Sequence, residues 1–412
     1  YKTYAFGFDE LLPVSGEKQN NWGGLGTTLI DSLDTLWLMD MKHEFWEARD
    51  WVNDELSFDA PDSEVSVFET TIRNLGGLLS AYDLSGDICF LDKAKDLGNR
   101  LIKAFSTPSG IPYGSVNLRS NSKPRDVRVA GGRAIISEIG TLQIELRYLS
   151  KATGDKSFAI KAEKVIEILK YLQPKNGLFP IFITNMSFTP HFLGKKITFG
   201  GLGDSLYEYF LKVWLQGGRT ESMYRIMYDK SIEGMHDELL KQSPQSGLWY
   251  IATYDNGRMD RNMEHLVCFM GGLLALGAYT DPLGLDSERA QRDLNTARKL
   301  TYTCYQMYAH FDTGISPETV RFNYDIVAKD AQYMLRPEAV ESFFVLSFLT
   351  SDPIYREWGW EVFQSIEKFC KTDIAYGALK DVRRKDLKPE NRMESFFLAE
   401  TMKYFFLLFD PD

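Results

Sequence analysis

The stretch 64–81 has the clearest pattern of apolar positions in the chain. Its apolar residues recur at helical spacing, at Val67, Phe68, Ile72, Leu75, Leu78 and Leu79. This spacing predicts a largely buried helix with Ser66 as its N-cap. Glu69 and Arg73 lie four residues apart in its first turns and share a face. On an open surface they would form a minor ion pair, but the apolar surroundings favour a buried carboxylate with a function.

Similar apolar segments alternate along the chain with segments that have one polar face. The apolar pattern predicts inner helices at 27–41, 67–84, 134–149, 203–215, 264–278, 337–349 and 395–409. The amphipathic pattern predicts outer helices at 1–12, 44–56, 90–105, 158–172, 221–240, 288–307 and 355–369. If 1–12 is the partner of 395–409, these segments form seven pairs.

A second marker recurs between the helices. Five short segments open with a turn glycine and continue as a short strand, at Gly110, Gly177, Gly247, Gly314 and Gly377. These glycines lie 67, 70, 67 and 63 positions apart, which indicates one supersecondary unit used repeatedly. The units vary and no linker divides the chain, so we expect one all-α domain over residues 1–412. We predict that this domain is an (α/α)7 barrel with short β-hairpins at one end.

Acidic residues lie near the starts of the predicted inner helices. They are Asp31, Asp34, Glu69, Glu138, Asp204, Glu264, Glu338, Glu341 and Glu400. In a closed barrel the inner-helix N-termini converge, so these acids would line one pocket. Paired carboxylates serve glycoside hydrolysis, and oxygen-rich acidic sites also suit calcium. A helical scaffold or a cyclase without sugar chemistry is the alternative from another class, and it leaves the acids unexplained.

Composition and the absence of several motifs exclude some classes of partner and reaction. The net charge of −10 argues against nucleic acid or an anionic membrane as the main partner. The longest apolar run, 266–279, is too short to span a bilayer, so we expect a soluble module without membrane contact. No G-x-S-x-G elbow, P-loop or dinucleotide fingerprint occurs, and the absence of C-x-x-C and H-E-x-x-H argues against zinc. One sequon begins at Asn185 and would suit a luminal protein.

Five motifs together resemble a known family. They are TLIDSLDTL at 28–36, VFETTIR at 67–73, GGLGDS at 200–205, LRPE at 335–338 and SFFLAET at 395–401. Their types and order resemble the class I α-1,2-mannosidases, glycoside hydrolase family 47, closest to the Golgi-type subgroup. The resemblance implies an (α/α)7 barrel and an inverting exo-hydrolase that removes α-1,2-linked mannose from high-mannose N-glycans. It also implies one bound Ca²⁺, a monomer, and a location in the lumen of the Golgi or endoplasmic reticulum. A glycan-binding mannosidase-like protein of quality control, with little hydrolysis, is the alternative.

The resemblance also assigns site residues. It implies that Glu69 is the general acid, Glu338 the base, and Asp204 a second carboxylate considered for the acid role. Sugar-pocket and supporting positions are Arg73, Glu138, His265, Arg336, Glu341, Phe396 or Phe397, and Glu400. In family members that trim a single mannose an arginine takes the place of Leu202, so leucine implies removal of several mannoses. The family positions further imply a Cys268–Cys304 disulfide, with Cys89 and Cys370 free.

The calcium site departs from the family pattern. In the family a threonine of a Thr-Glu-Ala-His-Pro-like motif supplies oxygens to calcium, and no such motif occurs in residues 1–412. Glu341 and Glu400 would then hold the ion through waters.

The roles of Glu338 as base and Glu69 as acid predict that their pKa values differ. Glu338 follows Arg336 and lies in a first helical turn, so cation and helix dipole favour its ionised form. For Glu69 we predict a pKa raised by the apolar surroundings and opposed by Arg73, with Asp204 as the fallback acid. An inverting pair should stand roughly 6.5–9.5 Å apart.

Overall fold

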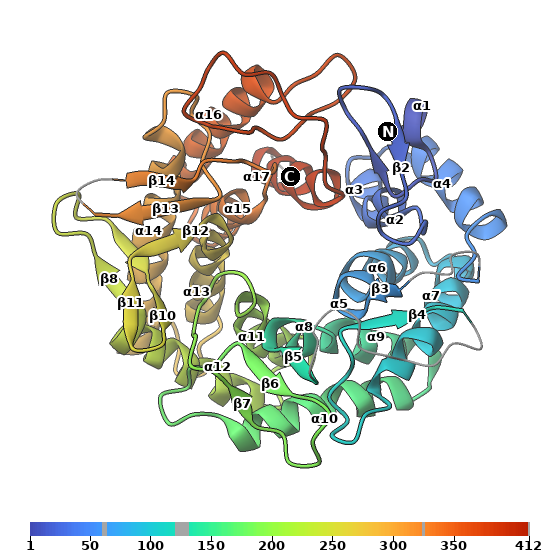
Figure 1. Cartoon of the computed structure of the whole chain (residues 1–412), viewed down its shortest axis with the longest axis horizontal. Helices are drawn as coiled ribbons and strands as arrows, with labels where there is room; N and C mark the ends of the chain where they lie inside the picture. The colour runs from blue at the N-terminus through green and yellow to red at the C-terminus, as the bar shows by residue number, and fades with distance from the viewer. Residues whose placement is uncertain (60–63, 120–131, 324–325, 411–412) are drawn as a thin grey trace.

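A closed ring of inner helices surrounds a central cavity, and longer amphipathic helices cover the ring (Figure 1). The computed structural model describes residues 1–59, 64–119, 132–323 and 326–410. The inner segments, in chain order, are α2 (Thr27–Asp31) with α3 (Leu33–Leu38), α5 (Val67–Glu69) with α6 (Gly76–Ser85), α8 (Ile136–Gly140) with α9 (Gln143–Thr153), α11 (Asp204–Gln216), α13 (Phe269–Tyr279), α15 (Glu338–Thr350) and α17 (Met402–Phe409). Neighbours in this order pack together and α17 completes the circle. The predicted (α/α)7 barrel is confirmed.

The outer layer consists of amphipathic helices that each connect two inner segments. They are α4 (Lys42–Asp54), α7 (Ile88–Leu101), α10 (Ser157–Leu172), α12 (Ser222–Gly234), α14 (Glu288–Ala309) and α16 (Ile354–Phe369). Their apolar faces pack on the inner ring, and their polar faces are exposed. Among the described helices, none has both the length and the hydrophobicity that a bilayer crossing requires.

One predicted outer helix is wrong. Within 1–12 only α1 (Lys2–Ala5) is helical, and β1 (Glu10–Leu11) pairs with β2 (Lys18–Gln19). Gly7 ends the helix at a φ of 80°, where a Cβ atom would meet the Trp51 ring at 2.5 Å. The buried Asp9 carboxylate then accepts hydrogen bonds from the backbone N–H groups of Trp22, Gly24 and Leu25. These contacts fix a loop where the apolar pattern suggested a helix.

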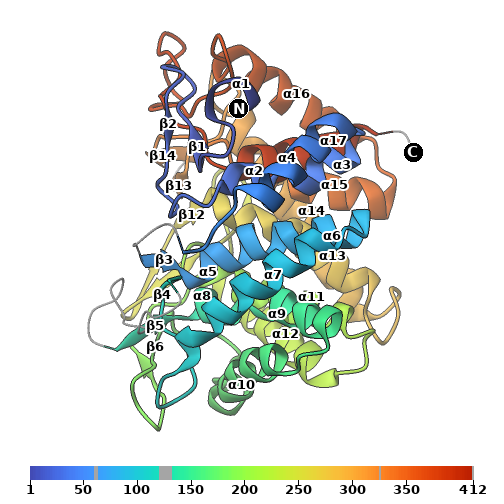
Figure 2. The ribbon, with the colours of Figure 1, turned by 90° about the vertical axis from the view of Figure 1, so that its right-hand side faces the viewer.

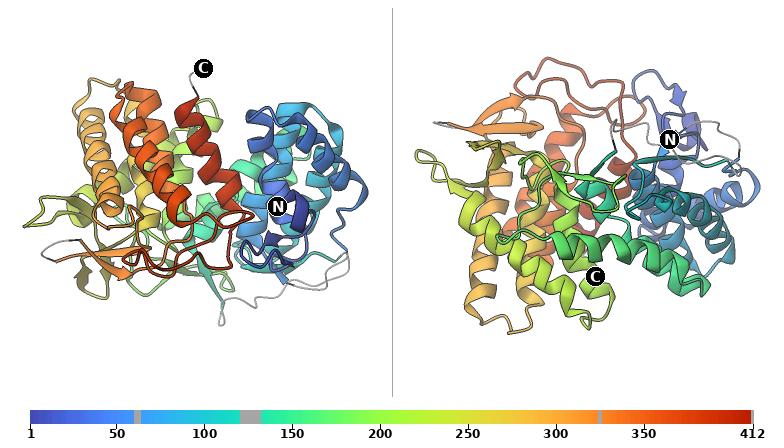
Figure 3. Two further views of the ribbon diagram at one scale, coloured as in Figure 1. Left: turned by 90° about the horizontal axis from the view of Figure 1, so that it is seen from above. Right: turned by 60° about the horizontal axis from the view of Figure 1, so that its bottom comes forward.

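Short strands gather at one end of the barrel, and the end of α17 lies at the other (Figures 2 and 3). Four of the five predicted turn glycines adopt positive φ, and each is followed by a strand. These strands are β4 (Ser115–Asn117), β6 (Phe182–Thr184), β9 (Trp249–Ile251) and β13 (Thr319–Phe322). Gly377 has no positive φ, and Leu379 forms only an isolated bridge with Tyr333. The tertiary fold therefore omits the fifth strand.

The hairpins explain why acids stand at the inner-helix starts. Strand β3 (Glu64–Ser66) pairs with β4 and leads directly into α5, where Glu69 lies. Strand β5 (Arg133–Ile135) pairs with β6 and leads into α8, where Glu138 lies. Strand β12 (Asn262–Glu264) leads into η4 (His265–Cys268), a 3-10 turn that precedes α13. Each strand-to-helix junction thus presents polar side chains at one barrel end.

Two inner helices contain π-helical turns at this end. The turn η1 (Thr70–Leu75) joins α5 to α6 and contains Arg73. The turn η5 (Phe397–Thr401) precedes α17 and contains Glu400. Such turns shift the direction of the side chains that follow and often occur at functional sites.

Candidate active site

A cavity of about 640 Å³ lies inside the ring, and its lining includes residues of the helix starts that follow the short strands, such as Phe68 and Ser137. Its lining includes Asp31, Asp34, Glu69, Glu138, Asp204, Glu338 and Glu400, all acids that the sequence predicted for one pocket. Arg73, Leu202, Arg336, Glu341 and Phe396 line it as well. Eight of the nine predicted acids therefore line one cavity. The ninth, Glu264, does not line it, and its carboxylate accepts a hydrogen bond from the Gly201 amide.

Glu69 and Arg73 meet in the cavity wall, as their spacing predicted. Ser66 caps the helix by accepting the Glu69 N–H, and Arg73 Nε donates to Glu69 Oε2 at 2.9 Å. Arg73 also donates to Ser395 Oγ at 3.2 Å and lies 3.6 Å from Asp31. The guanidinium therefore links carboxylates from two inner helices and Ser395.

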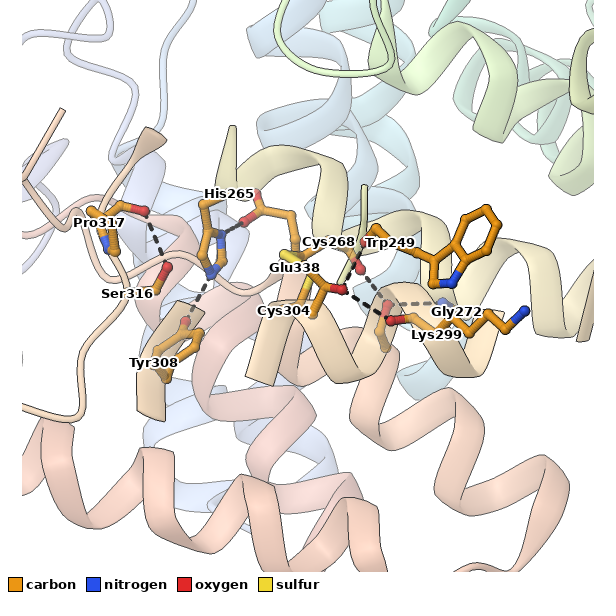
Figure 4. Close-up of a disulfide and its surroundings, with 12 residues drawn as sticks. Trp249, His265, Cys268, Gly272, Lys299, Cys304, Tyr308, Ser316, Pro317 and Glu338 are labelled. Atoms are coloured by element: carbon orange, nitrogen blue, oxygen red, sulfur yellow. Dashed lines mark hydrogen bonds and ion pairs between the residues drawn. A yellow bond between two sulfur atoms is a disulfide. The ribbon is translucent and has the colours of Figure 1, made fainter. Parts of the chain in front are cut away.

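Glu338 begins α15 and is held from two sides. His265 Nδ1 lies 2.9 Å from Glu338 Oε2 (Figure 4). On the other side, Arg336 Nη1 lies 4.0 Å from Glu338 Oε1. Burial raises the pKa of Glu338, but the hydrogen bond from His265 and the charge of Arg336 oppose this effect and leave the pKa below its usual value. The helix N-terminus favours the same ionised form. Glu338 is thus a carboxylate near neutral pH.

Arg336 connects Glu338 to a residue that the sequence did not single out. Its Nε donates to Glu318, which follows Pro317 just before β13, and Glu318 also accepts the Met334 N–H. The buried guanidinium therefore has two carboxylate partners, as a buried charge requires.

Asp204 starts α11 behind a tight glycine turn. The amide of Gly201 donates to Glu264 Oε2 at 2.7 Å, and Leu202 adopts a φ of 78° with its side chain 38% exposed at the cavity wall. Burial raises the pKa of Asp204 to about 7, and Glu208, Glu264 and Glu338 add to the rise, although the Ser205 N–H opposes it. Asp204 is therefore partly protonated near neutral pH.

The deeper part of the cavity holds a second group of charges. Lys212 pairs with Glu208 and lies 3.5 Å from Glu341. Burial raises the pKa of Glu341, with Lys212 opposing, and raises the pKa of Glu400 to about 8. Glu145 is nearby in the lining, accepts the Tyr209 hydroxyl at 2.6 Å, and has a pKa raised to about 7 by burial. Several acids in this part of the cavity are buried close together, so little water stabilises their charged forms.

These acids offer carboxylate oxygens but do not form a complete set of metal ligands. In the described part of the chain, no three His, Cys, Asp or Glu side chains lie close enough together to hold a metal ion. Glu341 and Glu400 both face the cavity, and a cation would relieve their crowded charge. The residues therefore fit an ion held through water, as carboxylates around hydrated cations do.

The remaining predicted residues separate into two groups. Phe396 lines the cavity, and the guanidinium groups of Arg73 and Arg336 lie 5.5 and 5.9 Å from its ring. Phe397, the alternative, is fully buried and packs against Tyr376 outside the cavity. His265 is 1% exposed and stands behind Glu338 without lining the cavity. Phe397 is therefore a core residue, and His265 acts on the site from behind.

Several residues of the cavity were not among those predicted. Asp204, Glu208 and Lys212 follow one another at intervals of four on α11, and Glu145 lies seven residues after Glu138. In the helices predicted from the sequence, both spacings return to the same helix face, so Glu145, Glu208 and Lys212 could have been predicted from their spacing. No such spacing pointed to Ser395 or Glu318, because these residues reach the site only when the ring closes.

The predicted disulfide is confirmed. Cys268 and Cys304 are bonded, with Cα atoms 5.8 Å apart, and join η4 to α14. Cys89 and Cys370 are free and buried.

Comparisons with known proteins agree with this geometry. The family model described as Glycosyl hydrolase family 47 matches residues 1–412. The chain is 44% identical over 415 residues to mannosyl-oligosaccharide 1,2-alpha-mannosidase MNS1 of Arabidopsis thaliana. It is also 44% identical over 426 residues to the endoplasmic reticulum mannosyl-oligosaccharide 1,2-alpha-mannosidase of Homo sapiens. These matches cover all of this chain, which spans 72% of the plant protein and 59% of the human one.

Solved structures give the same result for the fold. The alpha-1,2-mannosidase from Trichoderma reesei superposes with a TM-score of 0.92 at 28% identity, covering 100% of this chain and 90% of that chain. A D-mannose isomerase superposes with a TM-score of 0.64 at 12% identity, covering 92% of this chain and 98% of that chain, which shows a shared fold only.

Proposed function

This chain belongs to glycosyl hydrolase family 47, and we propose that it hydrolyses terminal α-1,2-linked mannose from high-mannose N-glycans with inversion. One observation carries the proposal. Two carboxyl groups in one cavity have pKa values displaced in opposite directions, Glu338 downward and Asp204 upward to about 7. Such a difference is what an acid and a base need in order to act together near neutral pH. The names of the relatives give the substrate class.

In this mechanism Glu338 is the base. Its ionised form accepts a proton from a water, and that water attacks the anomeric carbon from the face opposite the leaving oxygen. The glycosidic oxygen receives a proton from an acid on the other side. Inversion requires room for the water, so the separation of roughly 6.5–9.5 Å between acid and base carboxyls stays a prediction.

Asp204 is the favoured acid. Glu69, which the resemblance assigns to this role, is ion-paired with Arg73, whereas Asp204 retains a proton to about pH 7. An acid has to be protonated at the start of the reaction. We therefore assign Asp204 the acid role, and we assign Glu69, in the same cavity, the role of an acceptor for sugar hydroxyls.

The remaining lining residues recognise the sugar. Arg73 and Arg336 present donors around the Phe396 ring, which offers an apolar face to a pyranose. Glu138 adds an acceptor in the same wall. Glu341 and Glu400 would hold a Ca²⁺ ion through water, and this ion would supply positive charge that polarises sugar hydroxyls.

We propose further that residues 1–412 are one catalytic domain that acts as a monomer. The support is that the cavity takes residues from near both chain ends, so no shorter part contains the whole site. The disulfide and the endoplasmic reticulum in the name of the human relative support an oxidising lumen of the secretory pathway.

The test is incubation with a nine-mannose glycan, with calcium and with chelator. We expect release of mannose, and proton NMR of the first-formed sugar should show the β-anomer. Release of the α-anomer would indicate a covalent intermediate and overturn the inverting mechanism. Glycan binding without mannose release would instead support the glycan-binding alternative.

A further inference from the structure

A short relay of hydrogen bonds leads from the outer layer to Glu338. Tyr308, on outer helix α14, has its hydroxyl 2.8 Å from His265 Nε2, and His265 Nδ1 lies 2.9 Å from Glu338 Oε2 (Figure 4). Tyr308 and His265 are each 1% exposed, and neither lines the cavity. Both side chains therefore lie behind the carboxylate, out of reach of a sugar.

The chemistry of the three groups fixes where the hydrogens lie. An ionised carboxylate only accepts hydrogen bonds, so Nδ1 of His265 carries the hydrogen that it shares with Glu338. In a neutral imidazole Nε2 is then an acceptor, and the Tyr308 hydroxyl donates to it. The tyrosine thus selects the tautomer that donates to Glu338.

The backbone supports this arrangement at both ends. Cys268 follows His265 by three residues, and Cys304 precedes Tyr308 by four, so the disulfide joins the same two elements about one helical turn from the relay. Edge-to-face packing of the His265 and Tyr308 rings, with centroids 5.6 Å apart, limits rotation of the imidazole. The disulfide thus joins the two elements, and aromatic and hydrogen-bond contacts hold the histidine side chain.

We propose that Tyr308 is a positioning residue for the reaction, which orients Glu338 by fixing the tautomer and direction of His265. The inference rests on the proposed function, because it takes Glu338 as the base. Other charged or titratable groups act on the same pair. Arg336 pairs with Glu338, the carboxyls of Asp204, Glu341 and Glu400 repel it, and the Tyr333 ring packs against His265.

The variant Tyr308→Phe removes one hydroxyl and keeps the ring. We expect kcat to fall about tenfold with KM little changed, since loss of one orienting hydrogen bond amounts to about 1.4 kcal/mol in the transition state. The acid limb of the kcat/KM profile should move to higher pH, because a misdirected imidazole stabilises the Glu338 carboxylate less. Tyr228→Phe is the matched control, since Tyr228 is also fully buried, on α12, with its hydroxyl 3.4 Å from the Leu273 carbonyl.

A double-mutant cycle separates positioning from general stability. If Tyr308 acts through His265, Tyr308→Phe should change kcat less than twofold in a His265→Gln background. An equal tenfold loss in both backgrounds, or an equal loss in Tyr228→Phe, would overturn the proposal.

The tautomer gives a readout that needs no turnover. In the active chain, ¹⁵N NMR should show the hydrogen of His265 on Nδ1, and Tyr308→Phe should produce a mixture of tautomers. The signal can be assigned because the chain has 5 histidines and His265→Gln removes one of them. An unchanged tautomer in Tyr308→Phe would contradict the inference even if the wild-type chain releases mannose. Absence of mannose release by the wild type, with the tautomer as expected, would contradict the proposed function and leave the relay intact.

Discussion

Ser395 donates a hydrogen bond to Asp31 Oδ2 at 2.6 Å, although 364 residues separate the two along the chain. Arg73 contacts both side chains, so the first, second and last inner segments meet in one polar cluster. The cavity wall is therefore complete only when the ring has closed. This closure makes the site sensitive to single changes in several distant helices.

Replacement of the proposed base should remove activity without removing binding. Glu338→Gln should lower kcat by about 10²–10⁴-fold, the usual contribution of a general base, and leave KM nearly unchanged. Steady-state kinetics with an α-1,2-linked mannose substrate measure both constants. Glu357→Gln, an exposed position on α16, is the control and should behave as the wild type. A large rise in KM without loss of kcat would show that Glu338 only binds the sugar.

The two displaced carboxyls predict a bell-shaped pH profile. The rate should fall at low pH as Glu338, whose pKa lies below its usual value, takes up a proton. It should fall again above about pH 7, where Asp204 loses the proton that it has to donate. Asp204→Asn should lower kcat/KM by about 10²–10⁴-fold and abolish the alkaline limb. If Glu69→Gln abolishes that limb instead, Glu69 is the acid.

Calcium-free protein should become less stable as the pH rises. The folded-state pKa values of Glu145, Asp204 and Glu400 are raised to about 7, 7 and 8 by burial. The folded chain therefore binds more protons than the unfolded chain, and its stability falls between the unfolded value near 4 and about pH 8. In chelator, Tm should drop by at least several degrees from pH 5 to pH 8.

Added calcium should reverse part of this loss, because a cation compensates the ionised carboxyls. Its effect on Tm should be larger at pH 8 than at pH 5 and should shrink in Glu400→Gln, whereas Glu357→Gln should keep it. A Tm that rises with pH in chelator would contradict the assigned pKa directions.

Leu202 should determine how many mannoses are removed. It lies on the cavity wall at a φ of 78°, and both leucine and arginine meet the same backbone strain there. Leu202→Arg adds length and five donors, so we expect products to shift from several trimmed species toward one. Chromatography of labelled glycans measures the pattern, with Leu202→Met as the control for size without charge. An unchanged pattern in Leu202→Arg would exclude this residue as the determinant.

The sequon at Asn185 should carry no glycan on the folded protein. Asn185 is fully buried, and its side-chain amide donates to the Pro112 carbonyl at 3.3 Å. A glycan would replace that hydrogen bond and could not fit in the packed interior. Peptide mass spectrometry of protein from a glycosylating host should find Asn185 unmodified. Ser187→Ala, which removes the sequon at a half-buried position, should leave the mass of the glycoprotein unchanged apart from the substitution. Occupancy at Asn185 would show that glycosylation precedes folding of this segment.

Local pattern accounts for much of what was predicted correctly. The alternation of apolar and amphipathic segments predicted the inner and outer layers, since helix faces are set by spacing along the chain. The resemblance of five motifs supplied the disulfide and the residues of the cavity wall. The continuous inner helices predicted at 27–41 and 134–149 are each divided, at Ser32 and at Thr141, where tertiary packing overrides local preference.

By itself the sequence determined the helical barrel and the ring of acids. Both depend on short stretches of sequence, namely the periodicity of buried positions and the junctions between strands and helices. Only the tertiary structure decided which groups touch. It placed Phe396 rather than Phe397 in the cavity, turned 1–12 into a loop around Asp9, and brought Tyr308 behind His265 and Glu338. The physical reason is distance along the chain. His265 and Glu338 are 73 residues apart, and the pKa of a buried carboxyl depends on neighbours that meet only when the ring closes.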